Sequence, residues 1–538
     1  MAFQANAQTA QYAFRISFTD KQGAPGLGNP LSLLSQRSLT RRITMGIALD
    51  STDRPVSAAY TDSVFKIISG KLHLKSRWQN HIVVLVTDTN AISTVRSTAF
   101  VRKVEYIGYF ATGLYKLSSG KDTTTTMAKT TGTSAYYGSA YEQTKLVNGD
   151  YLHDRGYKGK GKLIVVMDEG FNGVNTGPAF DSMMKTNRLV DKHNFVFNNN
   201  DIFSQYNHGT GCLSTIAGNL PGIYVGSAPE ADFALYVTEY AGGELPIEMD
   251  HILAATERAD SVGADVIAAS VGYNTFSPPF TSLVYADIDG KTTVAARAAN
   301  MATAKGIVFV VTAGNEGGNS WNYILTPGDA DSAITVGNVN NAKSPAGNSG
   351  FGPNASGKVK PEVCLQGSPA SAMYSTNSPS DRYGTSFSTP QLAGWVACLA
   401  QATNTDPTPW RLKKAIIESA HAYNSPGGQL GYGVPDFGLA YKLLNVKDTP
   451  EEQLTSVNWV MATPNPTKDA VTVRLLMQQT GNATISLIDA SGRFVMKSQY
   501  SFNAGKQSIQ VNMPASAGMY LLKVNANDKQ KTIRLVKQ

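Results

Sequence analysis

The chain has 538 residues, of which 42% are apolar and 16% charged, and at about 150 residues per domain this length predicts three or four domains. The apolar share excludes a disordered or collagen-like chain, and no stretch approaches the roughly 18 uninterrupted apolar residues of a membrane-spanning helix. The net charge of +7 does not indicate a nucleic-acid-binding protein, because the middle of the chain is acidic and no basic helix accompanies its basic ends.

Charge is distributed unevenly along the chain. Residues 1–118 carry 14 Lys and Arg against 6 Asp and Glu, and residues 458–538 carry 10 against 3, whereas residues 119–457 carry 23 against 31. Complementary charge favours association, so we expect the amino-terminal and middle blocks to be in contact. Most of the remaining charges are best explained as solvated surface.

The first eleven residues contain Ala5-Asn6-Ala7, the small-x-small pattern of a signal-peptidase site. The apolar segment that should precede such a site is missing. Either the start codon is placed late or the pattern is due to chance, and we favour the first because the carboxyl end also indicates export. Residues 1–11 are therefore interpreted as a signal remnant or a disordered segment.

Residues 12–118 alternate short strands and helices and predict a small α+β domain. Residues 88–99 predict a helix with Asp88 as its amino-terminal cap. The predicted strands are residues 12–18, 81–86 and 101–107. Residues 119–136 are rich in Ser, Thr and Gly and predict a linker that is open to proteolysis.

Residues 137–445 alternate continuous apolar runs with helical patterns. Strands that are buried on both faces have this composition, so the pattern predicts an α/β domain whose parallel sheet is flanked by helices. In such sheets, functional groups gather at the carboxyl ends of the strands. The apolar runs are residues 163–167, 233–237, 266–270 and 307–311.

Residues 458–538, after a linker at 446–457, contain short strands separated by turn residues. This spacing predicts a β-sandwich. The predicted strands are residues 471–477, 483–489, 494–500, 507–512, 519–524 and 532–536.

Three motifs in the middle domain carry chemistry when they are taken together. Asp168 stands where a buried strand ends, His208 begins a small-residue helical pattern, and Ser386 lies in Gly-Thr-Ser at the start of a helical run. Alone, each has a trivial explanation, such as a packed histidine or a helix cap. Together they supply a nucleophile, a base and a group that orients the base.

The order Asp168, His208, Ser386 on an α/β pattern resembles the subtilisin-like serine peptidases, or subtilases of peptidase family S8, over about residues 137–445. The resemblance implies that Asn315, in residues 310–317, donates its side-chain amide to the oxyanion hole, with the backbone N–H of Ser386 as second donor.

The resemblance also locates the substrate-binding segments. Ser270, Val271 and Gly272 are similar to the segment that pairs with the substrate backbone and lines one side of the P1 pocket. Thr312, Ala313 and Gly314 are similar to the other side. An extended peptide would add to this edge as a strand. Glu316 is a candidate for the pocket mouth, where it would favour basic P1 residues; its role is a hypothesis.

The sequence departs from the common subtilase pattern at several positions. Glu169 replaces a small or hydroxyl residue, Gly211 replaces a frequent histidine, and Phe387-Ser388 replaces Met-Ala. None of these removes a catalytic group, so we expect altered surroundings rather than inactivity. Cys212 stands where some subtilases of the proteinase K type have a buried thiol beneath the catalytic histidine; an inert core residue is an equal alternative.

No metal is required for the implied chemistry, and we expect no catalytic metal site. The three cysteines lack CxxC spacing, which supports neither a disulfide framework nor a zinc site. The family allows structural calcium, but residues 198–201 do not form a recognisable ligand loop. A polar surface turn is the preferred interpretation of that segment.

The flanking domains resemble a subtilase propeptide and the type IX secretion sorting domain of Bacteroidetes proteins. The second resemblance rests on residues 464–467, 491–493, 518–524 and 531–537. The first resemblance implies a zymogen that cleaves itself between Leu117 and Ala135. The second implies export across the outer membrane, after which the protein is secreted or attached to the cell surface. An accessory sandwich that binds carbohydrate or packs on the catalytic domain is the alternative for residues 458–538.

We therefore predict a secreted serine endopeptidase that acts through an acyl-enzyme intermediate. Its partners would be polypeptide substrates, its own propeptide and the secretion machinery. The alternative is a catalytically impaired surface binding protein on a subtilase scaffold, which the intact triad and oxyanion residues disfavour.

Overall fold

The structure is a computed structural model that describes residues 10–110, 135–375, 378–403, 407–445, 459–526 and 529–538. The chain divides at residue 444 into two compact units, which are described separately. The predicted signal remnant and both predicted linkers fall largely outside the described residues, so their boundaries stay predictions. Within the described ranges, none of the helices combines the length and apolar character that a bilayer-crossing segment needs.

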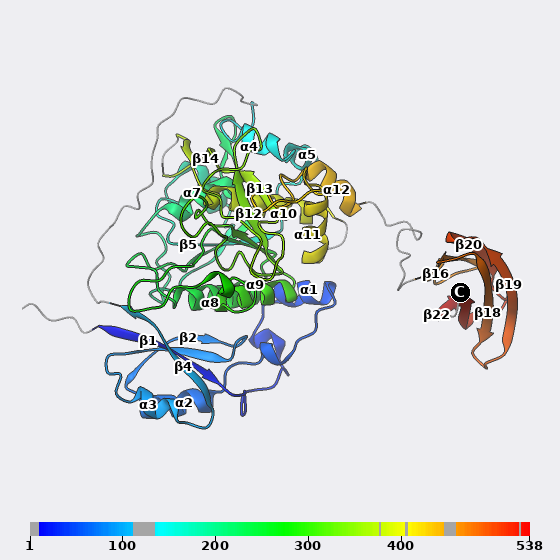
Figure 1. The fold of residues 1–538 in the computed structure, drawn as a ribbon, viewed down its shortest axis with the longest axis horizontal. Coiled ribbons are helices and arrows are strands. Elements are labelled where there is room, and N and C mark those ends of the chain that lie inside the picture. The colour runs from blue at the N-terminus through cyan, green and yellow to red at the C-terminus, as the bar shows by residue number, and fades with distance from the viewer. Residues whose placement is uncertain (1–9, 111–134, 376–377, 404–406, 446–458, 527–528) are drawn as a thin grey trace, which may run out of the picture. The chain divides into compact units, whose positions relative to one another are not determined.

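The amino-terminal part of the larger unit is an antiparallel sheet in the order β2-β3-β1-β4 (Figure 1). Its strands are β1 Gln11–Phe18, β2 Gly70–Ser76, β3 His81–Val86 and β4 Val101–Phe110. Its helices are α1 Gln36–Thr44, α2 Ala58–Ile67 and α3 Ile92–Arg96, with short 3-10 turns at Pro30–Ser32 and Ser51–Asp53. These elements confirm the predicted α+β fold.

The two faces of this sheet have different partners because successive strand residues point to opposite sides. Phe14 and Ile16 share a core with Val64 and Val95 of the helices α2 and α3. Ala13 belongs instead to the core of the following domain. The sheet therefore lies between its own helices and those of the neighbouring domain, as Figure 1 shows.

One helix prediction in this region is wrong in extent. The helix α3 covers only Ile92–Arg96 and begins after Ala91, not at Asp88. The Asp88 carboxylate accepts a hydrogen bond from the backbone N–H of Asn90, which closes a turn instead of capping a helix.

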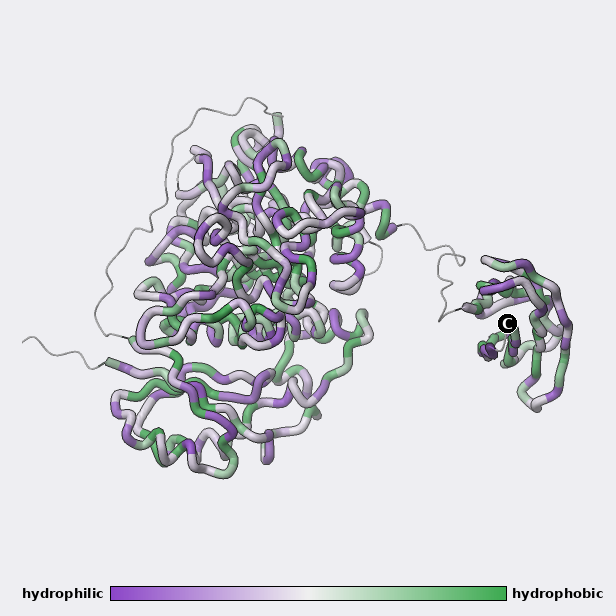
Figure 2. The backbone as a smooth tube through the Cα atoms, in the orientation of Figure 1, coloured by the Kyte–Doolittle hydropathy of each residue, from purple (hydrophilic) through white to green (hydrophobic). Residues whose placement is uncertain are grey.

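A seven-stranded sheet forms the centre of the larger unit, in the order β13-β12-β11-β10-β5-β9-β6, and its paired strands are parallel. Its strands are β5 Leu163–Asp168, β6 Leu189–Asn194, β9 Asp232–Val237, β10 Val266–Ala269, β11 Val308–Thr312, β12 Ile334–Val339 and β13 Val363–Gln366. Segments of hydrophobic residues, drawn in green, are frequent in the centre of the larger unit (Figure 2). The predicted fold class is confirmed.

Helices cover both faces of this sheet. The helices α8 Glu248–Val262 and α9 Val294–Ala304 lie on the side of the amino-terminal sheet, and α7 His208–Ala217 and α10 Thr385–Gln401 pack together on the other side (Figure 1). The remaining helices are α4 Tyr141–Leu146, α5 Asp150–His153, α6 Asp181–Lys185, α11 Pro409–Glu418 and α12 Phe437–Asn445, with 3-10 turns at Pro178–Phe180 and Tyr285–Asp287. Two small hairpins are β7 Asn219–Leu220 with β8 Tyr224–Val225 and β14 Ala370–Ala372 with β15 Ser380–Arg382.

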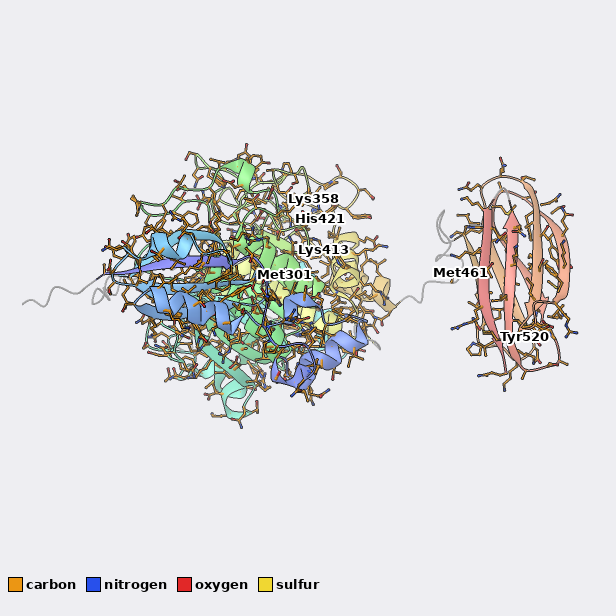
Figure 3. All side chains as sticks on the ribbon, turned by 90° about the horizontal axis from the view of Figure 1, so that it is seen from below. Met301, Lys358, Lys413, His421, Met461 and Tyr520 are labelled. Carbon is orange, nitrogen blue, oxygen red and sulfur yellow. The ribbon has the colours of Figure 1, made fainter. Side chains whose placement is uncertain are left out.

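Buried ion pairs connect these elements. The carboxylate of Glu362, just before β13, lies 2.9 Å from Lys360 and 2.7 Å from Lys413 of α11, which is labelled in Figure 3. Buried charges are stable only when they are paired and hydrogen-bonded. This cluster therefore holds α11 against the end of the sheet.

Ion pairs also cross between the amino-terminal domain and α8. Asp260 of α8 is contacted by Arg41 and Arg42, each at 2.6 Å, and Asp250 by Arg15 at 2.6 Å. The contact expected from the opposite charges of the two blocks is confirmed.

The smaller unit consists of two antiparallel sheets, β16-β17-β20 and β19-β18-β21-β22. Alternate residues of β17 are buried, and Val473 and Leu475 share a core with Ile485 and Leu487 of the other sheet. The strands are β16 Val460–Thr463, β17 Ala470–Met477, β18 Gly481–Asp489, β19 Phe494–Phe502, β20 Gly505–Asn512, β21 Gly518–Ala526 and β22 Lys529–Lys537. The predicted β-sandwich is confirmed.

Candidate active site

Asp168 is the last residue of β5 and is fully buried. Its Oδ1 atom accepts hydrogen bonds of 2.8 Å from His208 Nδ1 and from the backbone N–H of Glu169. A carboxylate can only accept, so His208 carries a proton on Nδ1 and its Nε2 atom is the free basic nitrogen of the neutral ring. The carboxylate thus fixes both the orientation and the tautomer of the imidazole.

His208 is the first residue of α7, and its side chain is 26% exposed. Burial lowers the pKa of His208, but the charge of Asp168 and the hydrogen bond to it outweigh this effect. The pKa of His208 therefore lies well above its usual value. The geometry holds a strong base at the carboxyl edge of the sheet.

Ser386 is the second residue of α10 and is 8% exposed. Gly384, just before the helix, has a φ of 138°, a conformation that favours glycine. Cys212 of α7 connects the two sides, since its sulfur lies 3.9 Å from His208 Nε2 and donates to the carbonyl of Ser386 at 3.2 Å. The Phe387 ring lies 5.8 Å from the His208 ring. Asp168 and His208 are thus in direct contact, and Cys212 and Phe387 connect His208 with the start of α10, where Ser386 lies.

Asn315 follows β11 and is exposed. Its Oδ1 atom accepts hydrogen bonds from the backbone N–H of Thr385 at 3.0 Å and from the Thr385 hydroxyl at 2.9 Å. A backbone N–H can only donate, which identifies the accepting atom as oxygen and directs the amide nitrogen the other way. The arrangement therefore leaves Oδ1, and not Nδ2, engaged with Thr385, the residue before Ser386.

Sequence reasoning missed the role of Thr385 in this arrangement. The Thr312 hydroxyl donates to Thr385 at 2.6 Å, and Thr385 donates in turn to Asn315. Both threonines are buried, so their hydroxyls have no competing water. The signal was present as the threonine directly before Ser386, but its target could be recognised only in space.

The predicted substrate-binding segments lie on adjacent strands. Ser270, Val271 and Gly272 follow β10, whereas Thr312 ends β11 and Ala313 and Gly314 follow it. Leu325 lies between them, because a Cβ atom on Gly272 would be 2.9 Å from Leu325 Cβ and one on Gly314 would be 2.5 Å from Leu325 Cγ. The space between the two segments is therefore filled by a leucine that sequence analysis did not single out.

Other predicted residues have local partners. The carboxylate of Glu316 accepts a hydrogen bond from Asn319 within one turn, so its proposed contact with substrate stays a prediction. The structure explains the glycine at position 211, because a Cβ atom there would be 2.5 Å from the Tyr374 hydroxyl. The histidine that is common in subtilases at this position would collide with Tyr374.

The described residues also contain one compact group of potential metal ligands. Asp168, His208 and Cys212 form a compact group, but these are the residues of the candidate active site. At the predicted polar turn, Asn198 and Asn200 interact with His193 at 3.2 and 3.0 Å, and Asp201 accepts from Ser204. These side chains do not converge as ligands of calcium, whose ligands are six to eight oxygens.

Comparisons with known proteins assign each region to a family. A family described as "Subtilase family" matches residues 159–434, about half of the chain. "Peptidase S8 propeptide domain, Bacteroidota" matches residues 13–123, and "Secretion system C-terminal sorting domain" matches residues 462–538.

Individual relatives are similar over the middle of the chain. Subtilisin DY of Bacillus licheniformis is 28% identical over 257 residues, which cover 47% of this chain and 82% of its own length. The minor extracellular protease Vpr of Bacillus subtilis (strain 168) is 28% identical, covering 34% and 21%. The thermophilic serine proteinase of Bacillus sp. (strain AK1) is 29% identical, covering 53% and 62%.

Proposed function

The chain belongs to the subtilase family of serine endopeptidases, and we propose that it hydrolyses peptide bonds through Asp168, His208 and Ser386. The observation that carries this proposal is the 2.8 Å hydrogen bond between Asp168 and His208 Nδ1. It leaves Nε2 as the basic nitrogen of His208, which would accept the proton of Ser386.

The proposed reaction has two halves. Ser386 Oγ attacks the carbonyl carbon of the scissile bond while its proton passes to His208 Nε2, and Asp168 stabilises the resulting imidazolium. His208 then gives this proton to the leaving amine, and the C–N bond breaks to give an acyl-enzyme. A water molecule, deprotonated by His208, releases the acid product and restores the hydroxyl of Ser386.

Asn315 Nδ2 and the backbone N–H of Ser386 are the proposed oxyanion donors. The hydrogen bonds from Thr385 to Asn315 Oδ1 support this role because they fix the amide before the substrate arrives. Loss of one such donor costs about 2.7–4 kcal/mol of transition-state stabilisation.

We propose that the P1 pocket accepts small side chains. Leu325 is 7% exposed and occupies the gap between residues 270–272 and 312–314. This arrangement favours Gly, Ala or Ser at P1 over the long basic residue that Glu316 suggested. Substrate selectivity would then rest on the size of the pocket and on main-chain hydrogen bonds.

The flanking domains define a secreted zymogen. An S8 propeptide domain precedes the subtilase domain, and the carboxyl-terminal sorting domain indicates export and attachment at the cell surface. We propose that residues 12–118 act as the propeptide and that the chain is cut in the linker 119–136. Residues 137–445 would be the catalytic domain, and 446–457 the linker before the sorting domain at 458–538.

Peptide hydrolysis in this family needs no cofactor. We propose no calcium site at residues 198–201, because the side chains there are engaged with one another and with His193.

Full-length variants test this function. Ser386→Ala should stay unprocessed in a purified preparation and hydrolyse no unfolded protein. Ser388→Ala is the matched control, since the Ser388 hydroxyl is buried in the same helical turn and donates to the Gly337 carbonyl. This control should mature and retain activity. Proteolysis by Ser386→Ala would contradict the proposal. A wild-type protein that hydrolyses nothing, together with normal maturation of Ser386→Ala, would favour a binding protein that another protease processes.

A further inference from the structure

The carbonyl group of Ser386 lacks its normal helical partner. In an α-helix this oxygen would accept a hydrogen bond from the N–H four residues later, and that residue is Pro390, within α10. Proline has no N–H, and its ring crowds the carbonyl four residues before it. A buried carbonyl that loses its donor is costly, so a donor from outside the helix would stabilise this oxygen.

Two side chains from other elements supply donors to this oxygen. The Ser270 hydroxyl, at the end of β10, donates at 2.9 Å, and the Cys212 thiol of α7 donates at 3.2 Å. Both side chains are buried. The residue that carries the proposed nucleophile is therefore held through its main chain by a strand end and by the helix that carries His208.

Cys212 contacts the base as well as the nucleophile's residue. Its sulfur lies 3.8 Å from Nδ1 and 3.9 Å from Nε2 of His208. Nearly equal distances to both ring nitrogens place the sulfur beside the ring, not in line with either nitrogen, so the thiol proton is best directed at the Ser386 carbonyl. Burial raises the pKa of Cys212 to about 11, which keeps this proton in place at neutral and mildly alkaline pH.

We propose that Ser270 and Cys212 are positioning residues that replace the hydrogen bond lost at Pro390 and thereby fix Ser386 against His208. This inference rests on the proposed function, in which Ser386 is the nucleophile. The peptide unit that carries the carbonyl is bonded to the Cα atom from which Oγ projects. Rotation of that unit toward another donor would displace both Oγ and the neighbouring oxyanion N–H.

The proposal gives Ser270 a role different from that of a substrate contact. A side chain that bound the peptide would affect KM, whereas a positioning group affects kcat, because its contribution is made at the reacting atoms and not to the bound substrate. Cys212 is fully buried, so its thiol has no surface with which to contact a substrate.

The test uses the mature enzyme from the full chain and the variants Ser270→Ala, Cys212→Ala and the double variant. Each single variant should lower kcat about tenfold, the size expected for one buried hydrogen bond, with KM within about twofold of wild type. The rate of fluorophosphonate labelling at Ser386 should fall in parallel with kcat. Cys212→Ser retains a donor and should recover most of kcat.

Cys398→Ala is the matched control. Cys398 is a buried thiol in α10, the helix that carries Ser386, and it donates to the Ser227 carbonyl at 3.1 Å. If the effect of Cys212 were only structural, both cysteine variants would lower the melting temperature and kcat alike. We expect similar melting temperatures and a loss of kcat in Cys212→Ala alone.

The inference would be overturned by a double variant that keeps kcat within twofold of wild type, or by an equal loss of kcat in Cys398→Ala. A change confined to KM would instead make Ser270 a substrate contact and would also overturn it. Absence of labelling at Ser386 in the wild-type enzyme would be a failure of the proposed function, which separates the two claims.

Discussion

At the scale of single residues, we expect the Asp168–His208 pair to determine the pH range in which the site is active. The base must be neutral to accept a proton, and the nearby carboxylate favours its charged form. Because the pKa of His208 is raised above its usual value, the neutral form accumulates only as the pH rises above that range. The enzyme should therefore work best at neutral to alkaline pH.

The pH profile of kcat/KM tests this pair. In the wild type we expect kcat/KM to rise with pH through an inflection above 6.5. Asp168→Asn removes the charge that raises the pKa, so the inflection should move to lower pH while kcat falls about 10⁴-fold. Peptide hydrolysis measured from pH 5 to 10 checks both effects. An unchanged inflection in Asp168→Asn would show that Asp168 does not control the base.

A second residue, Leu325, should control the P1 preference. In Leu325→Gly the space between residues 270–272 and 312–314 opens, and kcat/KM for peptides with P1 Leu or Phe should rise at least tenfold relative to P1 Ala. One buried methylene is worth about 0.8 kcal/mol, so a leucine-sized space is sufficient for this change. Glu316→Gln is the comparison variant, and a large effect of it on P1 Lys cleavage, with none from Leu325→Gly, would reverse the assignment.

At the scale of elements, the start of α10 organises the site through hydrogen bonds from its neighbours. The Thr312 hydroxyl at the end of β11 donates to Thr385, which donates to Asn315. The helix thus fixes both proposed oxyanion donors, the Asn315 amide and the N–H of Ser386.

Removal of one hydroxyl tests this arrangement. Thr385→Val keeps the shape of the side chain and the backbone bond to Asn315 but loses the 2.9 Å hydroxyl bond. We expect kcat to fall about tenfold at constant KM. Thr389→Val is the control, because Thr389 lies one turn later in the helix and its hydroxyl donates to the Thr385 carbonyl, not to Asn315. Equal effects in the two variants would argue for a general disturbance of the helix.

The sequence predicted those elements whose signal is local. The central strands β5, β9, β10 and β11 are continuous apolar runs and lie close to their predicted positions. The edge strand β6, with the sequence LVDKHN, is more polar and was not predicted. The strand β2 is also polar and was not predicted. Its side chains pack against α8 of the neighbouring domain, a contact that its own sequence does not reveal.

Within the candidate site, the sequence could identify side chains with intrinsic chemistry but not those that act through contacts. Asp168, His208 and Ser386 form a recognisable order of residue types. Leu325 and Thr385 matter only because the fold places them against other segments, and nothing in their own neighbourhood distinguishes them from ordinary core residues.

At the scale of the whole molecule, the amino-terminal domain is joined to α8 through buried ionisable groups. The Nε2 atoms of His73 in β2 and His251 in α8 are 3.2 Å apart, and His251 Nδ1 lies 2.9 Å from the Thr238 carbonyl. Burial, together with neighbouring positive charge, lowers the pKa of His73 to about 3, and burial lowers that of His251 to about 4. Both rings are therefore neutral in the docked state.

This contact should weaken in acid. A histidine whose pKa is depressed by docking favours the docked state above pH 6.5, and that contribution is lost as the pH falls toward 4 because the separated form binds the proton. The charges of Lys71 and His193 also lower the pKa of His73, whereas that of Asp250 raises it. Burial raises the pKa of Glu257, so protonation of Glu257 favours the docked state in acid and opposes the effect of the histidines. The two histidines together should outweigh the single glutamate.

Co-elution of the cleaved amino-terminal domain with the catalytic domain in gel filtration measures this effect. We expect a complex at pH 7.5 and partial separation near pH 5. His73→Leu should remove part of the pH dependence, whereas His193→Gln, a change to a partly buried ring of β6 whose charge has only a small influence on His73, should remove much less of it. Equal release at both pH values in the wild type would contradict the role of the histidines.

The central claim is that Ser386 is the nucleophile and His208 its base, and covalent labelling of the mature enzyme by a fluorophosphonate followed by peptide mapping tests it most directly. We predict one phosphonyl group per chain, on Ser386, with loss of proteolysis in proportion to labelling. The same reaction should be about 10²–10⁴-fold slower in His208→Ala. Labelling of a different residue, or a processed wild-type protein that resists labelling, would contradict the claim.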